Sequence, residues 1–296
     1  MGETGPGRVW ERPGVALAHE TYRRLLGPTW APVDPARLRR AVSGRVVLVT
    51  GASSGIGEAS AELLGTTGAT VLLAARRGEV LDEMAARIRS RGGAASAYAV
   101  DLTDLDAVDR LVHDVLADHG RVDVVVSNAG KSIHRSLADT TDRFHDVTRT
   151  NSLNYLGPVR LLMGLLPQMR ERGSGHVVDV NSLNVDLPAA NWAVYTASKS
   201  AFDAWLSCIA PEVRVDGVAT TSIHFPLVHT PMSAPTYDPS LPALTADDAA
   251  QVIGRVLVTR PRLLVPWWVR LAAPVQAAAP EVADAVTARF LRRKQR

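Results

Sequence analysis

Cysteine and lysine are scarce in this chain of 296 residues. The one cysteine, Cys208, excludes an internal disulfide and fits a reducing compartment. It lies in the apolar run AFDAWLSCIA, where we expect a buried structural thiol. Lysine occurs only at positions 131, 199 and 294, so arginine carries nearly all of the positive charge. The net charge is +3, and because acidic residues are dispersed among the arginines, we expect solvated surface and no nucleic-acid partner.

Long apolar runs are also missing. No stretch approaches the roughly 18 apolar residues that cross a bilayer, and the N-terminal MGETGPGRVWERPG lacks the apolar core of a secretory signal. We therefore expect a cytoplasmic protein, with peripheral membrane contact left open. The histidines show no metal-ligand spacing, which argues against a bound metal.

Short β-branched runs alternate with helical patterns from residue 45 onward. The runs that predict buried strands lie at 45–50, 70–75, 122–127, 176–180 and 220–225. This alternation predicts an α/β fold, a Rossmann-type doubly wound parallel sheet in a three-layer α/β/α arrangement. Such a sheet places its binding crevice at the carboxyl ends of the strands.

Two segments fall outside this alternation, so we expect one Rossmann domain at 44–262 with an extension at each end. Residues 1–43 form an arm rich in proline and arginine, and residues 263–296 form an amphipathic tail that contains Trp267 and Trp268. The tail could form an interfacial helix on a membrane, or its tryptophans could pack against the core or a second subunit. Both alternatives remain open.

A glycine-rich turn, TGASSGIG (50–57), lies between the first predicted strand and a helix. In this position Gly51 allows the tight turn, Gly55 lets the backbone approach a pyrophosphate, and Gly57 permits close packing of helix on strand. Unpaired N–H groups at the helix N-terminus would face the phosphates. The turn predicts a dinucleotide-binding site, whose other expected residues are Ser53, Ser54 and Ile56.

No carboxylate follows the second predicted strand, where a cofactor without a 2′-phosphate usually meets one. The sequence there reads AARR and ends with Arg76 and Arg77. A guanidinium pairs with a phosphate that an acidic residue would repel, which predicts NADP(H) as the cofactor. Arg76 is the first choice for the contact, and the alternative is that both arginines are simply solvated.

The stretch YTASK, residues 195 to 199, places a tyrosine and a scarce lysine one helical turn apart. If the stretch is helical, Tyr195 and Lys199 share one face. The ammonium would stabilise a tyrosinate and make Tyr195 a better proton donor and acceptor near neutral pH. A chance pair on a surface helix is the alternative for this pattern taken alone.

TGASSGIG, SNAG (127–130), Ser182 and YTASK occur in the order and spacing of the classical short-chain dehydrogenase/reductase family, which this chain resembles over about 44–260. The resemblance implies that Tyr195 is the catalytic acid/base. Lys199 would lower the pKa of Tyr195 and bond the nicotinamide ribose, and Ser182 would polarise the substrate carbonyl. Asn154, with Asn151 as the runner-up, would hold a water in the proton relay.

The same resemblance implies further cofactor contacts. Asp101, with Leu102, would meet the adenine, although an aspartate after a strand is often a helix cap. Leu227 stands where the family commonly has glycine, so the backbone there could differ. The other implied cofactor residues are Asn128, Ala129, Gly130, Pro226, Val228 and Thr230.

A second resemblance rests on shorter matches. The segments FPLV.TPM.APT and GKSI.RS and the long N-terminal arm are similar to the reductase domains of bacterial fatty acyl-CoA reductases and of actinobacterial relatives that reduce ketones on very long acyl chains. Pro-rich residues 233–244 would cover the pocket as a lid, or serve only as a connection. The expected substrate residues are mostly apolar: Leu183, Asn184, Leu187 and Trp192.

These patterns predict an NADP(H)-dependent oxidoreductase that transfers a hydride between nicotinamide and an apolar or long-chain carbonyl or alcohol. One alternative substrate is a compact cyclic or steroid-like ketone. An alternative of another class is a catalytically silent dinucleotide-binding scaffold or sensor. The family resemblance also implies a homodimer or homotetramer, formed by helices within 140–170 and 189–210.

Overall fold

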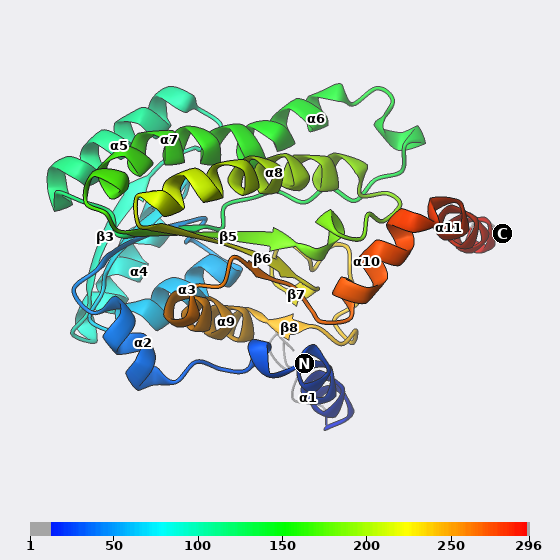
Figure 1. Ribbon diagram of the computed structural model, residues 1–296, viewed down its shortest axis with the longest axis horizontal. Helices are drawn as coiled ribbons and strands as arrows, with labels where there is room; N and C mark the ends of the chain where they lie inside the picture. Colours follow the sequence, from blue (N-terminus) through cyan, green and yellow to red (C-terminus); the bar gives the residue numbers. More distant parts are fainter. Residues whose placement is uncertain (1–12, 295–296) are drawn as a thin grey trace, which may run out of the picture.

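A seven-stranded parallel sheet forms the centre of the molecule (Figure 1). The computed structural model describes residues 13–294 and, within them, the side chains of residues 17–285 and 287–289. The strand order is β3-β2-β1-β4-β5-β6-β9. The strands are β1 Val46–Thr50, β2 Thr70–Ala75, β3 Ala94–Ala99, β4 Val124–Ser127, β5 Gly175–Ser182, β6 Val218–Phe225 and β9 Leu263–Leu264.

Helices cover both faces of this sheet (Figure 1). One face is covered by α2 Pro35–Val42, α3 Gly55–Gly65, α4 Gly78–Ser90 and α9 Ala246–Thr259. The other face is covered by α5 Leu105–His119, α7 Gly157–Glu171 and α8 Ala193–Val215. This is the three-layer Rossmann-type fold that the sequence predicts.

The central strands are apolar along their length because both faces are buried. In β1, Val47 and Val49 join the core cluster on one face, whereas Val46 and Leu48 join the cluster on the other. Successive side chains of a strand point to opposite faces. A continuous run of β-branched residues can therefore fill both cores.

Two strands of the sheet were not predicted. β3 has the sequence AASAYA and is only partly buried, because it lies at one edge of the sheet. β9 contains two residues at the opposite edge. The five predicted strands are present, with ends that differ by up to two residues from the expected ranges.

The N-terminal segment packs on the same core as the sheet. It contains α1 Pro13–Leu26, a 3₁₀ turn η2 Pro28–Trp30 and α2. Leu26, Trp30 and Leu38 are buried in the cluster that includes α9. The helices contribute apolar residues to the core, although proline and arginine dominate the composition of this segment.

The C-terminal segment returns to α1. It forms α10 Val269–Ala278 and α11 Pro280–Lys294. Just before α10, Trp267 donates a hydrogen bond from Nε1 to the carbonyl of Leu25, at 2.8 Å. Figure 1 shows α10 beyond the carboxyl ends of the strands, on the side where α1 also lies.

Smaller elements connect these layers. They are a 3₁₀ turn η3 Ala138–Thr140, α6 Phe144–Asn151, a π-helical turn η4 Ser152–Leu156, a 3₁₀ turn η5 Leu183–Val185, and the short parallel pair β7 Val228–His229 and β8 Leu244–Thr245. Within residues 13–294, no helix combines the length and apolarity that crossing a membrane requires.

The expectation of a buried cysteine is wrong. Cys208 is exposed on α8. The residue that fills the core from this turn of the helix is Leu206, which is fully buried. The apolar run AFDAWLSCIA thus has one buried face, and Cys208 lies outside it.

Candidate active site

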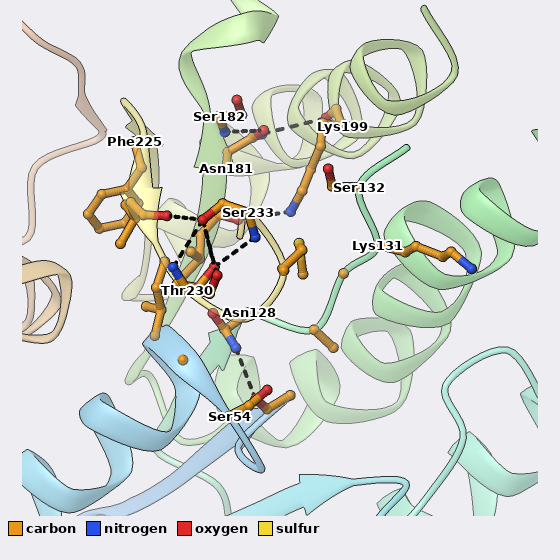
Figure 2. Close-up of a pocket in the computed structure, with 18 of the residues that line it drawn as sticks. Ser54, Asn128, Lys131, Ser132, Asn181, Ser182, Lys199, Phe225, Thr230 and Ser233 are labelled. Atoms are coloured by element: carbon orange, nitrogen blue, oxygen red, sulfur yellow. Dashed lines mark hydrogen bonds between the residues drawn. The ribbon is translucent and has the colours of Figure 1, made fainter. Parts of the chain in front are cut away.

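A cavity of about 590 Å³ opens at the carboxyl ends of the parallel strands, where an open α/β sheet places its ligand. Its wall combines the glycine-rich turn, the ends of β4 and β5, the first turns of α8 and the segment after β6. Figure 2 shows Ser54 and Asn128 at one end of this cavity and Ser182 and Lys199 at the other.

The glycine-rich turn has the backbone that its sequence requires. Gly51 and Gly55 have φ angles of +64° and +58°, in the left-handed region that favours glycine. A Cβ at Gly57 would lie 2.3 Å from the carbonyl oxygen of Gly51 and 2.5 Å from Asn128 Nδ2. Gly57 itself does not line the cavity. It allows α3 to begin directly against the turn.

Thr50 and Asn128 lock this turn to β4. Asn128 Nδ2 donates to the carbonyls of Thr50 and Gly51, at 2.9 and 3.3 Å. Thr50 Oγ1 accepts from the backbone N–H groups of Asn128 and Ala129, both at 3.0 Å. Sequence reasoning missed Thr50, although it is the first residue of TGASSGIG.

The two arginines after β2 have different surroundings. Arg77 Nη2 donates to the carbonyl of Ser53 at 2.7 Å and to its hydroxyl at 3.1 Å, so it braces the turn. Arg76 lines the cavity and is exposed. Its guanidinium is thus placed for an anionic group that enters from solvent.

Asp101 bonds within its own turn. Its Oδ1 accepts from the N–H and hydroxyl of Thr103, at 2.9 and 2.8 Å. Asp104 is the residue that caps α5, through bonds from two backbone N–H groups. Leu102, and not Asp101, lines the cavity. The alternative of a helix cap at Asp101 is wrong, because Asp104 caps α5 and the Asp101 carboxylate bonds to Thr103.

Ser182, Tyr195 and Lys199 come together at the other end of the cavity. Ser182 ends β5, and the other two lie one turn apart on α8, as predicted from i and i+4 spacing. Lys199 Nζ donates to the carbonyl of Val180 at 2.8 Å. Trp192 contacts the Tyr195 ring edge-on, with centroids 5.6 Å apart.

The expected effect of Lys199 on Tyr195 is wrong in this structure. Burial raises the pKa of Tyr195 to about 12, although a hydrogen bond with Ser182 opposes the shift. Burial likewise lowers the pKa of Lys199, against the attraction of Asp179. Desolvation dominates both groups, because the ammonium is directed to the Val180 carbonyl and not to the phenol.

Asn154 lies in the π-helical turn η4 and is 1% exposed. Its Oδ1 accepts from the N–H of Lys131 at 2.8 Å, and its Nδ2 donates to the Lys131 carbonyl at 2.9 Å. A Cβ on Gly130 would lie 3.3 Å from Asn154 Oδ1 and 3.7 Å from Lys199 Nζ. Both polar groups thus flank Gly130.

Asn151, the alternative candidate, occupies a different place. It is the last residue of α6 and is half-buried. Neither asparagine lines the cavity, but Asn154 bonds to Lys131, which does, next to Gly130.

The segment after β6 forms one side of the cavity through Pro226, Leu227, Val228 and Thr230. Ser233 closes a turn here, donating to the Val228 carbonyl at 2.8 Å and accepting from Thr230 N–H at 3.0 Å. Among the described non-glycine residues, positive φ angles occur only outside this segment. Leu227 therefore fits where the family commonly has glycine.

The substrate side is more aromatic than the sequence indicated. Leu183, Asn184 and Trp192 line the cavity, but Leu187 does not. Tyr237, from the segment expected to be a lid, stacks on Trp192 with ring centroids 5.9 Å apart.

Two more aromatic residues come from distant parts of the chain. Tyr22 of α1 and Trp268 before α10 both line the cavity. Sequence reasoning missed them because it placed residues 1–43 and 263–296 outside the catalytic domain. The adjacent Trp267 and Trp268 were the one sequence feature that indicated packing of the C-terminal segment against the core.

The residues around the turn fit a nicotinamide dinucleotide. Gly51 and Gly57 are positions where a Cβ would strike neighbouring backbone or Asn128, and a Cβ at Gly55 would lie 3.2 Å from Thr230 Cβ. The turn opens α3, whose N-terminal N–H groups can receive a phosphate. No group of metal-ligating side chains occurs in the part of the chain that the structure describes.

Comparison with known proteins agrees with this geometry. Residues 45–240 match the model of the short chain dehydrogenase family. A fatty acyl-CoA reductase of Acinetobacter baylyi is 43% identical over 248 residues, which are 83% of this chain and 84% of that protein. A fatty acyl-CoA reductase of Mycobacterium tuberculosis is 44% identical over 253 residues, 84% of this chain and 82% of that protein.

A solved structure leads to the same conclusion. A metagenomic short-chain oxidoreductase in complex with NADP superposes with a TM-score of 0.66 and 33% identity, covering 76% of this chain and 98% of that one. With the family model and the two relatives, this likeness extends from the sequence motifs to the fold. The chain belongs to the short-chain dehydrogenase/reductase family of oxidoreductases.

Proposed function

We propose that this chain is an NADP(H)-dependent reductase of long-chain or otherwise apolar ketones or aldehydes. The observation that carries the proposal is the apolar wall beside Ser182 and Tyr195, which includes Trp192 and the stacked Tyr237. An apolar wall with a few convergent hydroxyls suits an apolar carbonyl compound. A small sugar would leave several hydroxyl groups without partners there.

The cofactor assignment rests on the glycine-rich turn and on Arg76. The exposed guanidinium of Arg76 at the cavity edge suits a 2′-phosphate, and the metagenomic oxidoreductase was solved with NADP. Bound NADPH supplies the hydride. Asn128, Ala129 and the nearby Thr230 would hold its ribose and nicotinamide portions.

Ser182 and Tyr195 would both donate hydrogen bonds to the carbonyl oxygen, where negative charge develops during reduction. Because burial raises the pKa of Tyr195 to about 12, its phenol is protonated and able to donate. Lys199 and Asn154, which both lie near the Cβ position of Gly130, would form the route by which Tyr195 regains its proton.

Long acyl chains are the proposed substrate class within the apolar carbonyl compounds. Two of the relatives that share 43–44% identity are called fatty acyl-CoA reductases. The cavity also extends to Trp268 and Tyr22, at the ends of the chain. These two rings would contact the part of the substrate furthest from the reacting carbonyl.

The proposed assembly is a homo-oligomer formed by the helices on the α7 face. Phe144, Leu156 and Met163 are exposed there, at 72%, 44% and 58%. Burying such side chains between two copies would remove them from water. Light scattering should give at least a dimer mass, and Met163→Glu should lower it. A monomeric wild type would refute this assembly.

Peripheral membrane contact is proposed for α10. Trp267, Leu271 and Val275 are spaced four residues apart and are 56%, 65% and 68% exposed. They flank Trp268, which lines the cavity, so an apolar substrate could enter from the interface. In a sedimentation assay with anionic vesicles, a larger fraction of wild type than of Leu271→Asp should pellet with the vesicles. Equal fractions of the two proteins in the pellet would argue against the contact.

The experiment that tests the proposed reaction follows NADPH and NADH consumption at 340 nm with aldehydes, 3-oxoacyl esters and acyl thioesters of increasing length, and with compact cyclic ketones. NADPH turnover that rises with chain length is expected. Activity confined to compact ketones would refute the long-chain substrate but keep the reductase. Absence of turnover in either direction would favour a silent dinucleotide-binding module.

A further inference from the structure

A cluster of ionisable groups connects the elements that carry Ser182 and Tyr195. Its centre is His224 on β6, which is 2% exposed. Its Nδ1 lies 2.6 Å from Asp186 Oδ2, and its Nε2 lies 3.1 Å from Asp203 Oδ1. We call His224, Asp186 and Asp203 the histidine clamp. None of the family motifs in the sequence includes these three residues.

The clamp requires a charged imidazole. A carboxylate accepts hydrogen bonds and donates none. The Ser222 hydroxyl, which also lies 3.1 Å from Nε2, donates to Asp203, so both ring nitrogens of His224 carry hydrogen. Burial opposes this charge, but the bonds to Asp186 and Asp203 outweigh burial and raise the pKa of His224 to about 9. The ring therefore acts as an imidazolium between two carboxylates at neutral pH.

One arm of the clamp holds α8. Tyr195, Lys199 and Asp203 are spaced four residues apart, so they lie on one face of this helix. The bond from His224 to Asp203 ties that face to β6. Ser222 strengthens the tie, because its hydroxyl lies 2.7 Å from Asp203 Oδ1.

The other arm holds the segment that follows Ser182. Ser182 ends β5, η5 follows it, and Asp186 is the residue after η5. The bond from His224 to Asp186 therefore fixes a short segment that begins at the Ser182 hydroxyl. The imidazole of His224 thus connects the segment that follows Ser182 to α8, the helix that carries Tyr195.

A second connection passes through β5. Asn181 pairs with His224 across β5 and β6. Asn181 Oδ1 accepts from the N–H of Ser182 at 2.8 Å, and its Nδ2 donates to Asp179 at 2.9 Å. Figure 2 shows Asn181 between Ser182 and Lys199. Asp179 also lies 3.2 Å from the Ser222 hydroxyl.

We propose that His224 is a positioning residue for the family reaction: held as an imidazolium by Asp186 and Asp203, it sets the separation between the Ser182 and Tyr195 hydroxyls. The inference depends on the reaction of the family and not on the identity of the substrate. His224 touches neither the substrate nor the cofactor, and acts through the two elements that it joins.

Other charges around the clamp come from each neighbouring element. Asp179 faces it from β5 and Lys199 from α8, while Arg262 acts on Asp203 from the segment before β9. Burial raises the pKa of Asp179. These groups do not remove the two direct carboxylate contacts of His224, so loss of its proton remains the event that opens the clamp.

The test compares His224→Gln, Asp186→Asn and wild type in kcat, KM and NADPH affinity, with dodecanal as the probe. A displacement of about 1 Å can cost about 100-fold in rate. We therefore expect His224→Gln to lose roughly 10- to 100-fold in kcat with little change in NADPH affinity. Asp186→Asn should retain activity at pH 7. As the pH is raised, this variant should lose activity at a lower pH than wild type does, because its imidazolium is less stabilised and loses its proton earlier.

The matched control is His176→Gln. His176 is also buried, on the neighbouring strand β5, and Nε2 lies 2.9 Å from Thr221 Oγ1. Burial lowers the pKa of His176 to about 3, so this ring carries no charge at neutral pH. We expect the control to keep both kcat and the pH profile of wild type.

Nuclear magnetic resonance tests the clamp independently of turnover. In protein labelled with ¹³C at histidine and tyrosine, His224 should titrate near pH 9, and lower in Asp186→Asn. The ring resonance of Tyr195, assigned with Tyr195→Phe, should shift in His224→Gln but not in His176→Gln. An uncharged His224 at pH 7, or an unmoved Tyr195 resonance in His224→Gln, would overturn the proposal.

Discussion

Lys199 is buried and Tyr195 is half-buried at the end of the cavity, where their ionised forms lose part of the stabilisation of water. The i and i+4 spacing predicts that they share a helix face, because that relation is local. Their pKa values depend on the direction of the Lys199 ammonium and on the surrounding walls. Local spacing carries no information on either, and the predicted depression of the Tyr195 pKa was therefore wrong.

Residues that reach the site from distant segments could not be identified from the sequence. Tyr22 and Trp268 belong to no motif and meet at the cavity through tertiary packing, whereas Tyr237 lies in the segment 233–244 that was expected to cover the pocket. Leu187, by contrast, was expected there because it lies between Ser182 and Tyr195 in sequence. In the structure Leu187 does not line the cavity, and its neighbour Asp186 contacts His224.

Tyr195→Phe should abolish turnover while NADPH still binds. Loss of the phenol proton donor is expected to cost about 100- to 10,000-fold in kcat. Stopped-flow absorbance measures the chemistry, and quenching of protein fluorescence measures cofactor binding. Turnover within threefold of wild type would contradict the role given to Tyr195.

Arg76→Ala and Arg77→Ala should separate cofactor choice from support of the turn. A lost charge-assisted bond of about 1.5–3 kcal/mol corresponds to roughly a 10- to 100-fold loss. We expect Arg76→Ala to lower kcat/KM for NADPH by this factor while sparing NADH. Arg77 binds Ser53, so Arg77→Ala should affect both cofactors alike. Equal losses in both variants would rule out selection by Arg76.

Gly57→Ala should destabilise the fold by about 1–3 kcal/mol, because its Cβ would overlap the Gly51 carbonyl. Gly78→Ala is the matched control, since its Cβ would meet only Ala99 Cβ, at 3.4 Å. Urea denaturation of both variants gives the comparison. Equal stability of Gly57→Ala and wild type would show that α3 can move away from the turn at little cost.

At the scale of elements, the pattern of apolar residues predicted the central strands of the sheet but not its two edge strands, β3 and β9. β1 and β2 are buried on both faces and read as uninterrupted apolar runs. β3 is half-exposed, and AASAYA carries little of that signal. The packing of α1 and α2 on the core was not predicted, because proline and arginine dominate the composition of this segment. Only a few of its side chains, such as Leu26 and Leu38, enter the core.

Leu38→Ala should therefore destabilise the whole fold, by about 2–5 kcal/mol. Leu38 is 1% exposed and belongs to the cluster that contains α9. Leu17→Ala, at a position 69% exposed on α1, is the control and should change stability by less than about 0.5 kcal/mol. Should Leu38→Ala match that control in urea denaturation, α2 would not be an integral part of the core.

At the scale of the whole molecule, the chain closes around its own site. Its first described helix and its C-terminal segment meet at the Trp267 bond to Leu25, and each contributes a ring to the cavity. The histidine clamp joins β6 of the sheet to α8 and to the residue after η5. The charge of His224 therefore affects both the stability of the fold and the geometry of the site, and a change of pH should alter both.

The stability of wild type should fall as pH rises through about 9. His224 has a raised pKa in the folded chain, so its contribution is complete below the unfolded value of about 6.5 and is lost above about 9. The difference corresponds to on the order of 3 kcal/mol. Thermal unfolding between pH 6 and 10 should show this loss in wild type and less of it in His224→Gln. Parallel curves for the two proteins would contradict it.

The most direct test of the account is to follow the hydride. NADPH deuterated at both C4 positions is incubated with dodecanal and either wild type or Tyr195→Phe, and the alcohol is analysed by mass spectrometry. Wild type should place one deuterium on the carbinol carbon, and the variant should give negligible product. Unlabelled alcohol, or equal labelled product from both proteins, would contradict hydride transfer assisted by Tyr195.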